Sequence, residues 1–188
     1  MTKEGLDKTD GPPGDAADCP PDYSANAIHL CRTAQINTLT LSRMADQKAN
    51  ILIGATFVVF SLSVTRLIGS EITIATISLA LTAFTSSLFA VLAVLPTTKS
   101  VAASDPHFNV LFFGHFTQVD EEEWKRNLLK ELEDDEAVFR TMLRDIYQNG
   151  QILHRRKYRF LGYAYRIFLS GLLITMIIYA AEYFNELA

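Results

Sequence analysis

Apolar and polar residues are separated into blocks along this chain of 188 residues. Two apolar blocks, at about 49–67 and 72–95, lie close together, and a third follows at about 160–181. The second block contains no charged residue and ends at Pro96. A helix of about 20 apolar residues spans the core of a bilayer. The pattern therefore predicts three transmembrane helices, with a long polar connection over residues 97–157 between the second and the third.

The third block is the least uniform, because Arg166 lies near its start. The long side chain of an arginine at this depth can carry its charge back to the membrane surface, so a span remains possible. The alternative is a buried helical hairpin in a soluble bundle. Soluble core helices normally show a polar stripe, whereas the second block offers only Ser and Thr, which can bond their own backbone carbonyls.

Basic residues gather on one side of the three predicted spans, at Arg43, Lys48, Lys99, Arg155, Arg156, Lys157 and Arg159. The other side holds only Arg66. Short basic segments stay on the cytoplasmic side of a membrane. We therefore expect the N-terminus and the 97–157 connection to be cytoplasmic and the C-terminus to lie outside.

The cytoplasmic parts are expected to be helical beyond an unstructured start. Residues 1–22 are rich in Gly, Pro and acidic residues, which predicts disorder, and they lack the pattern of a signal peptide. From Ser24 to Asn50 there is no Pro or Gly, so one helix could run from there through the first span. The expected fold is thus an all-α membrane protein with three transmembrane helices, a helical cytoplasmic region and a long first helix.

A single stripe along this first helix contains Leu39, Arg43, Asp46, Asn50, Ile53, Phe57 and Phe60, at spacings of three and four. The stripe is polar near the membrane surface and apolar inside it. One interpretation is that Arg43, Asp46, Lys48 and Asn50 line a packed or ligand-contacting surface. The other is that they form a solvated face where the span ends. Asp46 and Arg43, three residues apart, could form an ion pair.

The connection contains an apolar aromatic patch and two helix starts. The patch, residues 109–119, has Gly114 at an expected turn and is rich in aromatic rings, with Phe108, Phe112, Phe113 and Phe116 close together and His115 beside them. Exposure of such a patch is costly, so it forms a small core, lies at the lipid interface or makes a wall for a nucleobase. Acidic clusters beginning at Asp120 and at Asp134 predict two helix N-termini. The second of these helices could continue past Gly150 into the third span.

No catalytic or metal-binding motif occurs. The histidines, His29, His107, His115 and His154, lack zinc-site spacing, and neither a P-loop nor a GxSxG motif is present. The chain is therefore not expected to be an enzyme or to hold a cofactor or a metal. Its net charge of -4 argues against binding a nucleic-acid polymer. Cys19 and Cys31 are expected to be free thiols.

Three stretches resemble a known family. RTAQINTLTLSRMADQKANILIG (32–54), NVLFFGHF (109–116) and DIYQNGQILHRRKYRFLGYAYRIFL (145–169) are similar to the transmembrane effector of Pycsar antiphage defence. The most specific parts are the ADxKANILIG junction and the LFFGHF block. The resemblance covers nearly everything after the disordered segment, and it implies that residues 23–188 form one effector domain.

In that family a partner pyrimidine cyclase makes cyclic UMP or cyclic CMP on sensing phage, and the effector impairs the inner membrane before phage mature. The resemblance therefore implies an abortive-infection effector in the bacterial inner membrane, with its C-terminus in the periplasm. Three helices are too few for a wide pore, so homo-oligomeric rearrangement is expected, and small residues in the second span permit close helix contact. The alternative is a scaffolding membrane protein that recruits a soluble partner through its cytoplasmic helices and binds no nucleotide.

The sequence contains no β-roll cyclic-nucleotide domain, so a nucleotide would have to bind to helices and loops. Such a ligand needs a cation for its phosphate, an aromatic or apolar wall for its base, and amide or carboxylate groups for the base edge. The candidate ligand-binding or gating residues are Arg43, Asp46, Lys48, Asn50, Asn109, Phe112, Phe113 and His115.

Overall fold

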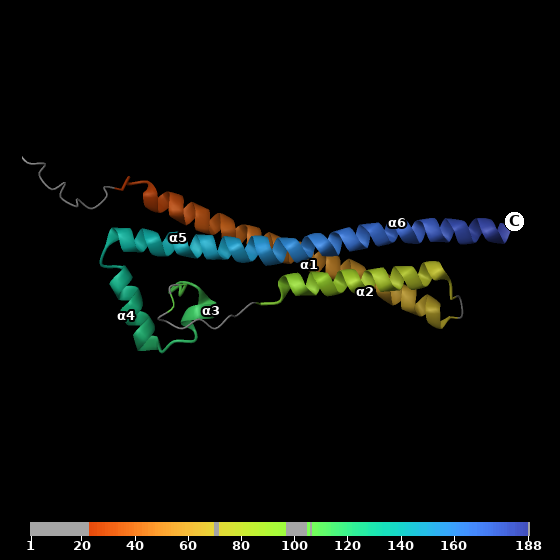
Figure 1. The fold of residues 1–188 in the computed structure, drawn as a ribbon, viewed down its shortest axis with the longest axis horizontal. Helices are drawn as coiled ribbons and strands as arrows, with labels where there is room; N and C mark the ends of the chain where they lie inside the picture. The colour runs from red at the N-terminus through yellow and green to blue at the C-terminus, as the bar shows by residue number, and fades with distance from the viewer. Residues whose placement is uncertain (1–22, 70–71, 97–104, 106, 188) are drawn as a thin grey trace, which may run out of the picture.

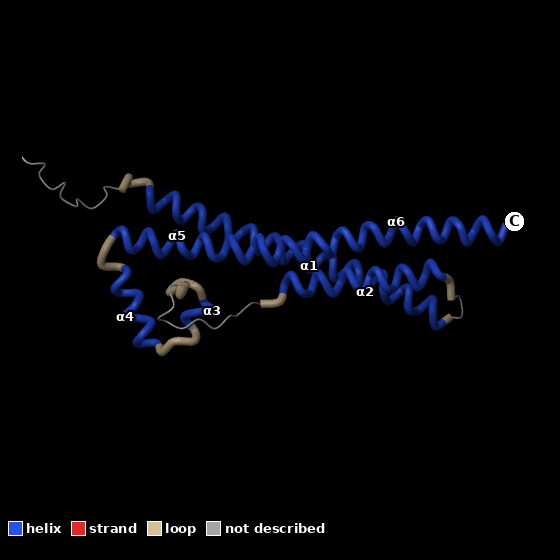
Figure 2. Tube along the Cα trace, in the orientation of Figure 1, coloured by secondary structure: helices blue, strands red, loops and turns tan. Residues whose placement is uncertain are grey.

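The computed structural model describes residues 23–69, 72–96, 105 and 107–187, and all regular structure within these ranges is helical (Figures 1 and 2). The first helix, α1 (Ala27–Ile68), runs unbroken for 42 residues. This confirms that one long helix leads from the polar N-terminal part of the chain through the first span. The second helix is α2 (Ile74–Val94). The disorder predicted for residues 1–22 falls outside the described residues.

The rest of the chain forms a short helical arm and a second long rod. Its elements are α3 (Phe113–Phe116), α4 (Glu121–Glu131), α5 (Asp135–Ile152), the π-helix η1 (Leu153–Tyr158) and α6 (Arg159–Leu187). Because α5, η1 and α6 follow one another without a break, the helix that begins near Asp134 does continue past Gly150 into the third span. We refer to this continuous element as the α5–α6 rod.

The helix starts in the connection follow from their capping residues. The Asp120 carboxylate accepts a hydrogen bond from the Glu122 N–H at 3.0 Å, and the Asp134 carboxylate accepts one from the Ala137 N–H at 3.2 Å. Each side chain satisfies one of the backbone donors that a helix N-terminus leaves free. Both predicted N-termini are therefore confirmed.

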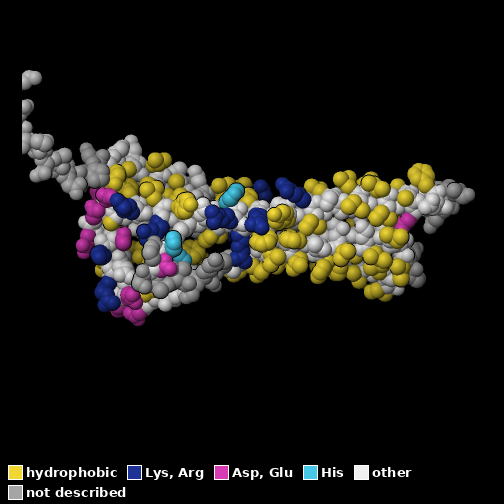
Figure 3. All heavy atoms as spheres, in the orientation of Figure 1, with side chains coloured by type: hydrophobic (Ala, Val, Ile, Leu, Met, Phe, Trp, Pro, Cys, Tyr) yellow, Lys and Arg dark blue, Asp and Glu magenta, His cyan; other side chains and the backbone are white. Residues whose placement is uncertain are grey.

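The molecule is elongated, and α1 and the α5–α6 rod run along most of its length (Figure 1). The N-terminal end of α1 lies at the same end as α3 and α4, whereas the turn between α1 and α2 and the C-terminus lie at the other. Charged side chains gather over the half that contains α4 and α5, and hydrophobic side chains dominate the half that contains α2 (Figure 3). We refer to these as the polar half and the apolar half.

Three helices are long and apolar enough to cross a membrane: α1, α2 and the α5–α6 rod. In the apolar half, α2 packs against both α1 and α6. Large apolar side chains such as Phe57, Leu81 and Leu173 are exposed along all three helices. This outward apolar surface is what lipid covers in a membrane protein, so the structure confirms the predicted three-span fold.

Most of the fully buried residues in the spans are small. The small-residue seam comprises Ala45, Ala49, Thr56 and Ser63 of α1, Ala75, Ala80, Ala83, Ser86, Ala90 and Ala93 of α2, and Ala164 and Gly171 of α6, all of them buried. The Ser86 hydroxyl donates a hydrogen bond to the Ala164 carbonyl oxygen at 2.8 Å, linking α2 to α6. Small side chains let helix backbones approach closely, which favours association in lipid.

Candidate functional site

A cavity of about 430 Å³ lies where the polar and apolar halves of the molecule meet. We term it the junction cleft. It is lined by Gln35, Leu39 and Ser42 of α1, Ala93–Pro96 at the end of α2, Leu111–Phe113 before and in α3, Asp145, Asn149 and Ile152 of α5, and Arg156 and Lys157 of η1. Its volume falls in the range of about 300–1,000 Å³ that is typical of small-molecule sites.

The basic end of the junction cleft is formed by Arg156 and Lys157. The Lys157 ammonium group donates a hydrogen bond to the Ser42 hydroxyl at 2.8 Å and pairs with the Asp46 carboxylate at 2.7 Å. These contacts tie η1 to α1. A π-helix holds more residues per turn than an α-helix, so consecutive side chains diverge less around its axis. This explains how two neighbouring basic residues both reach one cavity.

A buried carboxylate organises the polar wall. The Asp145 side chain, only 4% exposed, accepts hydrogen bonds from the side-chain amides of Gln35 at 2.7 Å, Asn149 at 2.9 Å and Asn109 at 3.2 Å. A buried carboxylate must be compensated by donors, and here α1, α5 and the loop before α3 each supply one. The network therefore fixes the positions of two amide groups, those of Gln35 and Asn149, at the cleft surface.

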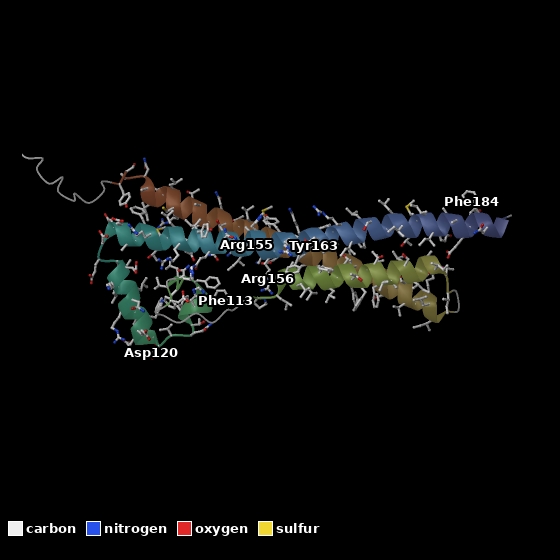
Figure 4. All side chains as sticks on the ribbon, viewed as in Figure 1. Phe113, Asp120, Arg155, Arg156, Tyr163 and Phe184 are labelled. Atoms are coloured by element: carbon white, nitrogen blue, oxygen red, sulfur yellow. The ribbon has the colours of Figure 1, made fainter. Side chains whose placement is uncertain are left out.

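Phe112 and Phe113 form the aromatic wall. Behind them, the His115 ring meets Phe112 edge-on, with ring centroids 4.9 Å apart, and stacks on Phe108 at 6.0 Å. Gly114, expected at a turn, lies within α3, and a Cβ there would come within 2.7 Å of the Phe112 ring. Glycine is therefore needed for Phe112 to fold over this turn. Phe113 is 56% exposed and lines the same cavity as Arg156 (Figure 4).

His115 supports the aromatic wall as a neutral side chain. Its Nδ1 atom accepts a hydrogen bond from the Asn109 backbone N–H at 3.1 Å, which requires an unprotonated Nδ1. Burial lowers the pKa of His115 from its ordinary value, and the negative charge of Asp105 opposes part of this effect. Trp124 of α4 holds the same segment from outside, because its indole N–H donates to the Val110 carbonyl oxygen at 2.9 Å.

The structure brings together some of the candidate residues predicted from the sequence. Phe112 and Phe113 line the junction cleft. Three others support it from behind: Asn109 through Asp145, His115 through Phe112, and Asp46 through Lys157. Asp46 therefore pairs with Lys157 of η1, and not with Arg43 as its spacing suggested.

Arg43, Lys48 and Asn50 are exposed and do not line the cleft. The stripe to which Arg43 and Asn50 belong lies beside the packed face of α1, which contains Ala45, Ala49 and Leu52. The two sets differ by one residue, a rotation of about 100° around the helix. A role of these three polar residues in ligand contact or gating therefore stays a prediction that the cleft itself does not support.

Five cleft residues were not among the candidates expected from sequence patterns: Gln35, Asp145, Asn149, Arg156 and Lys157. Gln35 and Asp145 are 110 positions apart, and although both lie in stretches that resemble the family, nothing in those stretches indicates that the two side chains meet. The basic run that contains Arg156 and Lys157 was interpreted only as a marker of membrane orientation. The position of Arg156 and Lys157 at the start of a span is the one signal for their place in the cleft, because a charge at that depth needs an anion or water beside it.

A second hollow, of about 340 Å³, lies between α4, α5, Asp105 and residues 108–110. It contains both Lys130 and Arg144 and both Asp105 and Glu131, so its charges are balanced. The Arg144 guanidinium already donates to the Phe108 carbonyl oxygen at 3.0 Å. An added anion would therefore find a weaker binding site in this hollow than in the junction cleft.

The junction cleft combines a cationic end, oriented amides and an aromatic wall. This chemistry suits a small anionic ligand that has a flat, partly apolar portion with polar edges. Within the described residues, no group of three or more His, Cys, Asp or Glu side chains could hold a metal ion.

A family model described as the Pycsar effector protein domain matches residues 29–182, which is most of the chain and includes the whole junction cleft. No curated protein and no solved structure matches.

Proposed function

The chain belongs to the Pycsar effector family, and from this premise we propose that it impairs the bacterial inner membrane in response to cyclic UMP or cyclic CMP. Family membership gives the coarser role: the chain is a membrane effector of antiphage defence that acts in response to a cyclic nucleotide, and it is not an enzyme. The pyrimidine identity of the nucleotide and the mode of membrane damage are parts of the proposal.

The observation that carries the proposal is the continuity of the two long helical rods across the boundary between the halves. The α1 helix has 42 residues, or about 63 Å at 1.5 Å per residue, and contributes both to the junction cleft and to the seam between spans. The α5–α6 rod does the same. A ligand bound at the boundary can therefore change span packing without an intermediate domain.

The size of the required effect can be stated. A ligand shifts a conformational balance only through its different affinities for the two states. Turning a 1:99 equilibrium into 99:1 needs a difference of about 5.5 kcal/mol. Several charge-assisted hydrogen bonds made in one state only, at about 1.5–3 kcal/mol each, are enough.

Oligomerisation and orientation complete the proposal. One protomer has too few spans to enclose a wide pore, so membrane damage requires several copies to rearrange together. We place the polar half in the cytoplasm, because Arg155, Arg156, Lys157 and Arg159 lie at the start of α6, whereas Arg66 ends α1 at the far end. The C-terminus is then periplasmic.

The test is dye leakage from liposomes that contain the purified full-length protein. Cyclic UMP or cyclic CMP, added to the side that carries the polar half, should release the dye, and cyclic AMP at the same concentration should not. Co-expression with a pyrimidine cyclase should arrest growth. Correctly inserted protein that leaks equally with and without either nucleotide would contradict the proposal.

One feature favours a scaffolding role as a second candidate. On the part of α1 that lies in the polar half, Leu30, Ile36 and Met44 are exposed apolar residues outside the seam. Such residues can bind a soluble partner. Under this alternative, changing Leu30 and Ile36 to Ser would abolish toxicity, whereas the liposome assay would show no response to nucleotide.

A further inference from the structure

We infer that the junction cleft is the nucleotide-binding site, and that the phosphate of the ligand takes over Lys157 from Asp46. This inference rests on the proposed function and deepens it, because it names the contacts through which the nucleotide would act. It also assigns ligand contacts to residues that were not among the candidates expected from the sequence: Arg156, Lys157, Gln35 and Asn149.

The phosphate position follows from the ion pair already present. The Asp46 carboxylate shows where an anion contacts the Lys157 ammonium group, at 2.7 Å. Both side chains of this pair are partly exposed, at 20% for Lys157 and 35% for Asp46, so a solute can reach them. Arg156 lines the same cavity, and a guanidinium binds phosphate oxygens through two parallel N–H groups. A singly charged cyclic phosphate can therefore replace the carboxylate as the partner of Lys157.

The base position follows from the opposite side of the cleft. Phe112 and Phe113 offer ring faces and edges for stacking, and Leu95 and Pro96 add apolar surface. Gln35 and Asn149 each use the side-chain nitrogen to bond Asp145. Both amides keep an acceptor oxygen, and Gln35 also keeps a second N–H, whereas the Asn149 side-chain nitrogen also bonds the Asp145 backbone carbonyl oxygen at 3.0 Å. These groups match the mixed donors and acceptors on the edge of a pyrimidine, which an inorganic phosphate lacks.

Binding of the nucleotide would then directly loosen the contact between α1 and the α5–α6 rod. The Asp46–Lys157 contact ties α1 to the rod at the level where both enter the apolar half. A phosphate that competes for Lys157 weakens this tie. The tie lies on η1, and π-helical turns inside α-helices occur often at functional sites. Ligand binding therefore acts on the segment that joins α5 to α6.

The decisive comparison is between two neighbouring arginines. Arg156 lines the junction cleft, whereas Arg155 is exposed and does not (Figure 4). Titration calorimetry of full-length protein in detergent should be run with cyclic UMP and with cyclic CMP. Arg156→Ala should weaken binding by at least about tenfold, since it removes a charge-assisted contact. Arg155→Ala should leave the affinity within about twofold.

Two further variants guard against a folding defect in Arg156→Ala. Phe113 is exposed, so Phe113→Ala should keep the fold and weaken binding by about tenfold through lost base stacking. Asp46→Asn removes the competitor for Lys157 and should tighten binding about two- to fivefold. Equal affinities for Arg155→Ala, Arg156→Ala and Phe113→Ala, or weaker binding by Asp46→Asn, would overturn the assignment.

The two levels of inference fail differently in this titration. If the wild-type protein binds neither nucleotide, the proposed function fails, and the assignment of the site falls with it. If the wild type binds one nucleotide and the Arg156 and Phe113 variants bind it equally well, the proposed function stands and only the placement in the junction cleft is wrong.

Discussion

The stability of the aromatic wall depends on the protonation state of His115. Its neutral ring accepts the Asn109 N–H and packs between Phe108 and Phe112. Because burial lowers its pKa below the ordinary 6.5, the unfolded segment takes up a proton at a higher pH than the folded segment does. The local stability is therefore full above pH 6.5 and declines as the pH falls through the lowered pKa.

This dependence can be followed through Trp124, the one tryptophan of the chain, which contacts Phe116 and bonds Val110. On acidification, its fluorescence should report loosening with a midpoint below pH 6.5. His115→Gln keeps an acceptor for Asn109 but cannot be protonated, so the transition should disappear. The same acid transition in both proteins would assign it to another group.

Asp145 is the second residue whose effect can be isolated. Asp145→Asn turns an acceptor of three amide N–H groups into a side chain that carries an N–H group itself, so at least one donor loses its partner. The expected loss of stability is about 1–3 kcal/mol. Thermal unfolding in detergent measures it. Glu136→Gln, which alters only the exposed contact with Arg140, should change little, and similar losses in both would contradict a special role for Asp145.

At the scale of helices, the small-residue seam sets how closely the spans approach. A Cβ on Gly171 would overlap the Thr82 side chain of α2, whereas a Cβ on Gly162, in the same helix, would meet nothing within 4 Å. Gly171→Ala should therefore destabilise the α2–α6 contact by about 1–3 kcal/mol, as overpacking does elsewhere. Gly162→Ala should be neutral or slightly stabilising, since alanine favours helix.

The same pair can be compared by thermal unfolding in detergent and by the amount of protein inserted in membranes. Equal melting temperatures for the two variants would mean that Thr82 moves aside at little cost. A selective loss in Gly171→Ala would show that close contact between α2 and α6 holds the spans together.

The sequence predicted the helices well because their signals are local. An apolar run marks a span, and an acidic cap such as Asp134 marks a start. The packed face of α1 was less accessible, because hydropathy separates polar from apolar residues, whereas packing inside a membrane selects for small volume. Ala49 and Thr56 are buried and Phe57 is 67% exposed, although Phe57 is the most apolar of the three.

Only the part of the candidate site that lies in a conspicuous sequence block could be predicted. The aromatic block around Phe112 and Phe113 is conspicuous in the sequence and does line the junction cleft. The partners of Asp145 come from distant parts of the chain, and pattern reasoning has no rule that brings Gln35 to it. The π-helix η1 places both Arg156 and Lys157 on the cleft. No pattern in the sequence predicts a π-helix at this position.

At the scale of the whole molecule, the two ends face different surroundings. The polar end carries α3, α4 and the first part of α1, and the far end carries Arg66, the α1–α2 turn and Glu182, whose carboxylate accepts the Ile74 N–H at 2.9 Å (Figure 1). With the polar half inside, a reporter inserted after residue 130 should stay cytoplasmic, and one at the C-terminus should be exported. If both reporters were active on the same side of the membrane, the third helix would not cross it and the topology would be wrong.

The position of η1 gives the rod the geometry of a lever. With 29 residues beyond this pivot, α6 extends for about 43 Å, so a tilt of about 10° there would displace its far tip by about 7 Å and its near end hardly at all. A displacement of that kind is uneven across the bilayer and, in the proposed orientation, it would part the lipids of the outer leaflet more than those of the inner one. Damage to the membrane would then begin on the side opposite the signal.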